Sequence, residues 1–321
     1  MATRKVSVVT GASSGFGRLL AERLARSGHI VHATMRDVLG RNRANATALA
    51  RLAAREHLKL CVEEMDVTSD EQVARTIEGI VRDEGRIDIL INNAGSLFGG
   101  VTEAFTAKEF RDQLDVNVLG AFRVSRAILP TMRRQQSGLL VHMSGVAGRL
   151  AVPFFGIYCA SKWALDALGE SLRYELAPFG VDSVIVEPGP FHTRLLEQAR
   201  RPADQVRSGE YGPTAAISNS LFTAFDQLFD TDPTATDPQR VVDAVCKLIE
   251  TPTGQRPLRT VVGVDFGVRG LNEATAVCGP AMLAALGLPH LESVEKAKGS
   301  LFTAAAAPRS SQAAEAAERS S

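Results

Sequence analysis

A tyrosine and a lysine stand four residues apart in the segment YCASK, as Tyr158 and Lys162. On a helix this spacing puts both side chains on one face, where the ammonium favours the ionised phenol. A phenol tuned in this way can protonate the oxygen of a ketone that has accepted a hydride, and it can act as the base in the reverse reaction. An isolated pair of this kind is more typical of a protein surface, so the other motifs must decide between catalysis and packing.

A glycine-rich loop near the N-terminus has the spacing of a dinucleotide site. The segment TGASSGFG, residues 10–17, lies between a predicted strand at 5–11 and a predicted helix at 17–28. Its glycines permit a tight turn and let the backbone approach a pyrophosphate, which the free N–H groups of a helix N-terminus favour. The residues expected to bind the cofactor here are Gly11, Ser13, Ser14, Gly15, Phe16 and Gly17.

The end of the second predicted strand, ATMRD, indicates which dinucleotide is bound. A site for NAD usually offers an acidic residue to the ribose 2′-hydroxyl at this point, whereas a 2′-phosphate needs a cation. The planar guanidinium of Arg36 suits a phosphate well. Asp37 follows directly and could serve a ribose hydroxyl. The sequence therefore favours NADP(H) and leaves NAD(H) as the alternative.

Short apolar segments alternate with segments of helical spacing along most of the chain. Strands that are apolar throughout, with helices between them, indicate a parallel sheet covered on both faces. The sequence therefore predicts an α/β fold: a doubly wound, Rossmann-type, mostly seven-stranded parallel sheet with helices on both faces. The predicted strands lie in 5–11, 29–37, 58–69, 87–95, 138–145, 181–189 and 259–265, and the helices in 17–28, 47–57, 70–85, 109–135, 158–180, 214–229 and 237–252.

Residues 1–300 are predicted to form one domain. Residues 191–240 contain many turn-forming residues and interrupt the alternation of strands and helices. Ligands of such sheets bind beyond the carboxyl ends of the strands, so this segment is expected to be a substrate lid rather than a surface elaboration. The apolar stretch 274–289 is too short to span a bilayer and is predicted to be a short packed helix. The low-complexity tail 301–321 is expected to be disordered.

Composition excludes several classes of partner. Lys and Arg together number 36, as do Asp and Glu, so a net charge of zero argues against nucleic acid as a partner. The four cysteines are scattered, which predicts reduced thiols in a cytoplasmic protein, with no disulfide framework and no metal site. The N-terminus leads straight into a strand, which leaves no room for a signal peptide.

Taken together, the motifs resemble the classical short-chain dehydrogenases/reductases, and most of all their estradiol and retinol dehydrogenase branch. The shared motifs are TGASSGFG, NNAG (92–95), DVNVLGAF around Asn117, YCASK (158–162) and EPGPFHT (187–193). The resemblance implies that Lys162 also holds the nicotinamide ribose and that Asn117 kinks its helix and helps to bind a proton-relay water. It further assigns to the cofactor site Asp66 and Val67, which should touch the adenine, and Asn93, Ala94, Gly95, Tyr158, Pro188, Gly189, Phe191 and Thr193.

One position departs from the family pattern. The serine that binds the substrate oxygen stands thirteen residues before the tyrosine in this family, and that position is Gly145. Ser144 is adjacent, but neighbouring side chains of a strand point to opposite faces. Three explanations remain open: the strand end turns Ser144 into the site, a donor from the lid replaces it, or the enzyme is slow or specialised. Ser144 is retained as the candidate catalytic serine.

The sequence thus predicts an NAD(P)(H)-dependent oxidoreductase that interconverts a carbonyl and an alcohol, with Tyr158 as general acid and base. LAVPFF (150–155) predicts an apolar pocket wall and favours a hydrophobic small-molecule substrate. The resemblance implies a homodimer or homotetramer. The rival hypotheses are a cofactor-binding scaffold or sensor with weakened catalysis, suggested by Gly145, and a methyltransferase, which the loop spacing and Arg36 disfavour.

Overall fold

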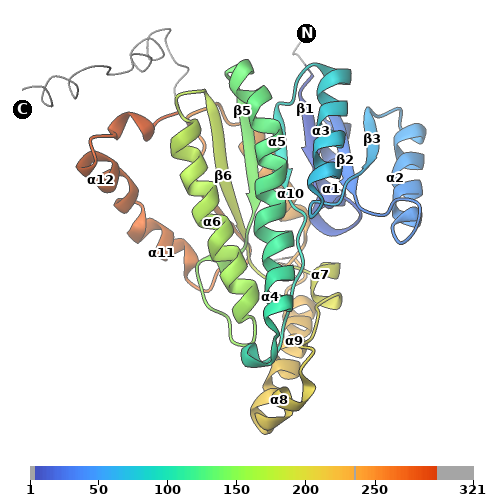
Figure 1. The fold of residues 1–321 in the computed structure, drawn as a ribbon, viewed down its shortest axis with the longest axis vertical. Coiled ribbons are helices and arrows are strands. Elements are labelled where there is room, and N and C mark those ends of the chain that lie inside the picture. Colours follow the sequence, from blue (N-terminus) through green and yellow to red (C-terminus); the bar gives the residue numbers. More distant parts are fainter. Residues whose placement is uncertain (1–3, 235, 295–321) are drawn as a thin grey trace, which may run out of the picture.

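The computed structural model describes residues 4–234 and 236–294, so the predicted disordered tail at 301–321 lies outside the described residues. Seven parallel strands form one sheet in the order β3-β2-β1-β4-β5-β6-β7 (Figure 1), which confirms the predicted doubly wound fold. The strands are β1 (Val6–Val9), β2 (Ile30–Met35), β3 (Leu60–Glu64), β4 (Ile89–Asn92), β5 (Gly138–Met143), β6 (Val181–Pro188) and β7 (Arg259–Val262).

Twelve α-helices occur in the described residues. They are α1 (Gly15–Arg26), α2 (Arg43–Arg55), α3 (Asp70–Glu84), α4 (Ala107–Leu114), α5 (Gly120–Gln135), α6 (Gly156–Leu176), α7 (Arg194–Glu197), α8 (Gln205–Glu210), α9 (Pro213–Thr231), α10 (Gln239–Glu250), α11 (Val268–Thr275) and α12 (Cys278–Ala285). Ser69 caps α3, because its hydroxyl accepts the backbone N–H of Gln72 at 3.2 Å.

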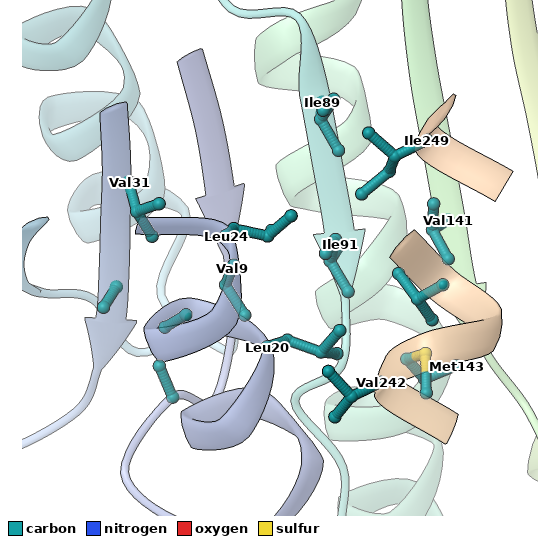
Figure 2. Close-up of a cluster of buried hydrophobic side chains, with 14 of the residues drawn as sticks. Val9, Leu20, Leu24, Val31, Ile89, Ile91, Val141, Met143, Val242 and Ile249 are labelled. Carbon is teal, nitrogen blue, oxygen red and sulfur yellow. The ribbon is translucent and has the colours of Figure 1, made fainter. Parts of the chain in front are cut away.

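The two faces of the sheet carry separate apolar cores. Leu20 and Leu24 of α1 pack with Val242 and Ile249 of α10 on one face (Figure 2), and α2 adds Leu49. On the other face, α3, α5 and α6 contribute the second core, which includes Ile77, Ile128 and Leu172. Both faces are therefore dry, as continuously apolar strands require.

The strand order reverses between β1 and β4, and this reversal determines where a ligand can bind. β1 pairs with β2 on one side and with β4 on the other, so the loops after β1 and β4 diverge to opposite faces of the sheet. A crevice opens at such a reversal, beyond the carboxyl ends of the strands. The loops carrying Gly11 and Asn93 both leave the sheet at this point.

The helix predicted at 109–135 is not regular. A π-helical turn, Asp115–Leu119, separates α4 from α5. The sequence predicted one helix at 274–289. The structure has α12 within this range and a further helix before it, α11, which the sequence did not indicate. Among the described residues, no helix is both long enough and apolar enough to cross a membrane.

Candidate active site

A cavity of about 830 Å³ opens at the carboxyl ends of the strands. Nearly all of the predicted site residues line it: Gly11, Ser13, Ser14, Gly15, Phe16, Arg36, Asp66, Val67, Asn93, Ala94, Gly95, Ser144, Tyr158, Lys162, Pro188, Gly189, Phe191 and Thr193. Gly17 and Asn117 are the exceptions, since both lie buried behind the cavity wall.

The phosphate loop is held in shape by residues that follow β4. The hydroxyl of Thr10 accepts the backbone N–H groups of Asn93 and Ala94, each at 2.9 Å. The Asn93 amide donates in return to the carbonyl oxygen of Thr10 at 2.8 Å. Gly11 has a φ of +66°, and a Cβ there would lie 2.8 Å from the Cα of Ala94. Only glycine fits at this position, so the loop offers bare backbone to a phosphate, as a dinucleotide requires.

The far end of the cavity is basic. Arg36 is half-buried, and within the described part of the chain no carboxylate lies within ion-pair distance of its guanidinium. Burial and the neighbouring Arg41 lower the pKa of Arg36. The carboxylate of Asp37 is engaged elsewhere, because it accepts the backbone N–H of Arg41 at 2.8 Å and does not line the cavity. Arg36 and Arg41 thus line this end of the cavity together with Asp66, whose carboxylate accepts hydrogen bonds from Thr68.

Tyr158 and Lys162 project from the first turns of α6 and are both buried. The Lys162 ammonium lies 5.7 Å from the centre of the Tyr158 ring and donates to the carbonyl of Met143 at 2.8 Å. Burial lowers the pKa of Lys162 to about 8, although Asp166 opposes the shift. Burial also raises the pKa of the Tyr158 phenol. The predicted lowering of the phenol pKa by Lys162 is therefore not seen in the protein alone.

Asn117 sits in the π-helical turn, which agrees with the kink that the resemblance implied. Its side-chain oxygen accepts the Ser96 backbone N–H at 2.8 Å. Its amide nitrogen donates to the Ser96 carbonyl and to the Ser161 hydroxyl, each at 3.0 Å. Asn117 thus ties the loop after β4 to helix α6. Because protein groups occupy its amide, a water would have to bind to a backbone carbonyl released by the wider turn.

Ser144 directly follows β5, and its backbone N–H continues the ladder to Val186 at 2.9 Å. Its hydroxyl is buried next to the carboxylate of Asp166, since both groups lie within 3 Å of the point where a Cβ on Gly148 would stand. Asp166 is two helical turns beyond Tyr158, or about 12 Å along the axis. No hydrogen bond joins the Ser144 hydroxyl to Tyr158 in the described structure. This placement disfavours the explanation in which the strand end turns Ser144 into the site.

Position 145 itself has room for a side chain. A Cβ on Gly145 would lie 3.4 Å from the carbonyl oxygen of Pro188 and 3.9 Å from the Ala147 nitrogen, which are ordinary contacts. Its φ of +155° lies at the edge of the region that only glycine adopts easily. A serine here would therefore need a small backbone adjustment, not new space.

The other end of the cavity is apolar. Phe155 is buried beside Tyr158, with ring centres 6.3 Å apart, and stacks on Phe225 of α9. Val152 and Leu221 add to the same cluster. The segment LAVPFF thus forms an apolar wall as predicted, and the 191–240 segment contributes the facing residues Leu195, Leu196, Gln198, Arg200, Leu221 and Phe225.

Sequence reasoning missed several residues that line the cavity. Arg41, Asn42 and Asn45 surround the basic end, and Phe266 follows β7. Arg41, Asn42 and Asn45 all belong to the polar segment GRNRAN, which starts four residues after Arg36 and could have indicated that they line the same end of the cavity. No sequence pattern predicts that Phe266 lines the cavity, because its position depends on the path of the chain after the last strand.

The chain belongs to the short chain dehydrogenase family, whose pattern it matches over residues 5–204. It is 30% identical over 259 residues to the 3-ketodihydrosphingosine reductase of Bacteroides thetaiotaomicron, covering 81% of this chain and 88% of the relative. Retinol dehydrogenase 8 of Homo sapiens is 33% identical over 277 residues, covering 83% of each chain. Kinship with 17-beta-hydroxysteroid dehydrogenase type 1 of Homo sapiens, 38% identical over 206 residues, covers 63% of this chain and 62% of that protein and agrees with the predicted branch.

Solved structures agree with this assignment. A short-chain dehydrogenase from Streptomyces avermitilis superposes with a TM-score of 0.70 at 32% identity, covering 89% of this chain and 99% of that one. Other structures of this fold were solved with NADP and one with NAD. The protein is thus an oxidoreductase of this family whose site fits a nicotinamide dinucleotide.

Proposed function

We propose that the protein is an NADP(H)-dependent oxidoreductase that interconverts a hydrophobic ketone and its alcohol. The observation that carries the proposal is the position of Tyr158, buried beside Lys162 between the basic and the apolar ends of one cavity. The preference for NADP(H) rests on Arg36 and Arg41. Two relatives are named for 3-ketodihydrosphingosine and retinol, which both contain a large hydrocarbon part, and this supports the hydrophobic substrate class.

Different residues of the chain have different roles in the proposed hydride transfer. A bound nicotinamide supplies or accepts the hydride. The Tyr158 hydroxyl gives its proton to the substrate oxygen during reduction and takes it back during oxidation. Lys162, charged below a pKa of about 8, holds the nicotinamide ribose and supplies positive charge beside the phenol. Phe155 and the α9 side chains exclude water from the reacting atoms.

A second function has one observation in its favour. The Ser144 hydroxyl is turned towards Asp166, and position 145 has no side chain, so neither position offers a hydroxyl to the substrate oxygen. A cofactor-binding scaffold or sensor with weakened catalysis would show this arrangement. The buried Tyr158 and Lys162, which such a protein does not need, favour the enzyme.

The decisive experiment is Tyr158→Phe. We expect turnover of NADPH with a panel of apolar ketones to fall by at least about 10³-fold, because the phenol is the only proton donor assigned to the substrate oxygen. The affinity for NADPH should change less than threefold, since the ring still packs against Phe155. Absorbance at the NADPH band measures turnover, and cofactor fluorescence measures binding. Full activity in this variant would contradict the catalytic assignment, and a wild-type protein that binds NADPH without turning over any ketone would favour the sensor.

Cofactor choice is tested separately by Arg36→Ala. We expect the Kd for NADPH to rise about 10- to 100-fold and that for NADH to stay nearly constant, because only NADPH carries the phosphate that the guanidinium meets. Arg51→Ala, which removes an exposed arginine of α2 outside the cavity, is the matched control. Equal weakening of both cofactors, or tighter binding of NADH by the wild type, would show that the site does not select NADP(H).

A further inference from the structure

Four potential metal ligands gather at one edge of the sheet, away from the cavity. His32 lies on β2 and is in register with Cys61 on the edge strand β3. Glu63, two residues further along β3, points to the same face of the sheet as Cys61. Glu84 ends helix α3, which covers this face. Residues from three elements thus converge on one place.

The distances between these groups are short. Ligand atoms of His32, Cys61 and Glu63 all lie within 4.8 Å of one another. The Nδ1 atom of His32 is 3.2 Å from a carboxylate oxygen of Glu63, and its Nε2 atom is 3.6 Å from a carboxylate oxygen of Glu84. Tetrahedral ligands at the usual zinc distances are about 3.3–3.6 Å apart. The cluster is therefore close to the size that a metal ion would impose.

The cluster also lacks a cation. Within the described residues, no lysine or arginine lies within ion-pair distance of Glu63 or Glu84; the histidine ring of His32 is the group that both carboxylates approach. His32 is only 4% exposed, and its Nε2 atom has no hydrogen-bond partner, which is costly for a buried polar atom.

We propose that this edge binds a zinc-type divalent cation through Nδ1 of His32, the thiolate of Cys61 and the carboxylate of Glu63. Glu84 then accepts the Nε2–H of His32, as a carboxylate commonly does behind a metal-bound histidine. A sulfur, a nitrogen and an oxygen ligand together suit Zn²⁺ and Co²⁺ better than Mg²⁺ or Ca²⁺, which prefer oxygen alone. A water completes the four ligands.

The bound ion would join the edge strand β3 to β2. Arg36 directly follows β2 and Asp66 closely follows β3, so the ion would steady the two strands that lead to the basic end of the cavity. This proposal departs from the expectation, drawn from the sequence, that the scattered cysteines form no metal site. The ligands come from two strands, and the carboxylate behind the histidine comes from a helix, so no local cysteine or histidine spacing reveals them.

Zinc binding to the full-length, reduced and chelator-stripped protein tests the proposal. We expect calorimetry to show one Zn²⁺ per chain, and zinc to raise the melting temperature. Co²⁺ should add a thiolate-to-cobalt absorption band in the near ultraviolet. Cys61→Ser should abolish that band and weaken zinc binding by at least about 100-fold, and Glu84→Ala should weaken it about 10- to 100-fold.

Matched controls use residues outside the cluster. Cys278→Ser removes another exposed cysteine, and Glu64→Gln alters the neighbour of Glu63 on the opposite face of β3; both should bind zinc like the wild type. Circular dichroism establishes that each variant is folded, and Cys61 and Glu63 are accessible enough for substitution to be tolerated. Absence of saturable zinc binding, or binding that Cys61→Ser leaves unchanged, would overturn the proposal.

Discussion

At position 145 the chain carries glycine where the family pattern that its motifs resemble has a serine. The nearby Ser144 lines the cavity, but its hydroxyl is buried against Asp166, and we therefore expect that it does not hold a substrate oxygen. We expect Ser144→Ala to change kcat less than threefold. Gly145→Ser should raise kcat by about tenfold, which is less than the 10²–10³ that an ideal oxyanion donor contributes, because the backbone must first leave its φ of +155°. Steady-state kinetics with the best ketone measures both effects.

Gly145→Ala is the control for this pair of variants. It introduces the same backbone strain without the hydroxyl, so its rate should fall below that of the wild type. A 10²-fold loss in Ser144→Ala together with no gain in Gly145→Ser would mean that Ser144 reaches the substrate after all.

Lys162 has a proposed role in the reaction, and the burial of its charge reduces the stability of the folded protein. Burial lowers its pKa from 10.5 to about 8, so at neutral pH the folded protein holds a charge that the unfolded chain would carry more easily. We expect Lys162→Met to abolish turnover yet raise the free energy of unfolding at pH 7 by about 1–2 kcal/mol. This gain is smaller than the full shift implies, because the hydrogen bond to Met143 is lost. Urea denaturation measures the change.

The pH dependence of that gain has a definite sign. Between pH 8 and 10.5 the unfolded chain binds more protons at Lys162 than the folded one, so the stability of the wild type rises with pH in this range relative to the variant. The advantage of Lys162→Met is therefore largest below pH 8 and shrinks as the pH approaches 10. A pH-independent difference would show that burial of the charge is not the cause.

At the scale of elements, the strands were the most predictable part of the fold. Each predicted strand is present, because a buried parallel strand is a continuous apolar run whose signal is local. The π-helical turn at Asp115–Leu119 was predictable only as a kink implied by resemblance, since its five residues fit a regular helix equally well. The extra residue in that turn is accommodated by contacts of Asn117 with Ser96 and Ser161, which are distant in sequence.

The structure of segment 191–240 was also only partly predictable from the sequence. Its turn-rich composition indicated an excursion from the sheet, and its position after β6 indicated the ligand edge. Its docking depends on pairings that no periodicity reveals: Arg200 exchanges backbone hydrogen bonds with Leu97 and Gly99, each at 2.9 Å, and the Arg201 guanidinium lies 4.0 Å from the Phe222 ring centre. The orientation of the Ser144 side chain was equally unpredictable from the sequence. The carboxylate that lies beside its hydroxyl belongs to Asp166, which is twenty-two residues away on α6.

At the scale of the whole molecule, one face carries apolar side chains that remain partly exposed among the described residues. Phe110, Leu119, Phe122 and Trp163, from α4, the π-helical turn, α5 and α6, are between 37% and 47% exposed. We propose that two copies pair through these helices, which lie together on one side of the sheet (Figure 1). Sedimentation of the wild type at micromolar concentration should then show a dimer or tetramer.

Phe122→Glu should shift that protein to monomers, because a buried unpaired carboxylate opposes association. Leu39→Glu alters an equally apolar residue on another surface and should leave the assembly unchanged. A wild type that sediments as a monomer would exclude this interface.

The buried ion pairs behind α6 limit how this protein can be recombined with its relatives. The part that matches the family ends at residue 204, yet Asp166, Asp182 and Glu187 within it are neutralised by Arg256 and Arg259, which lie beyond it. A chimera that exchanged the C-terminal third for that of another enzyme would leave Asp166 and Glu187 without Arg259, and Asp182 with Arg173 alone. Transplanting a substrate specificity into this scaffold therefore has to carry the two arginines along, whereas we expect that residues 204–231 of the 191–240 segment can be redesigned without disturbing them.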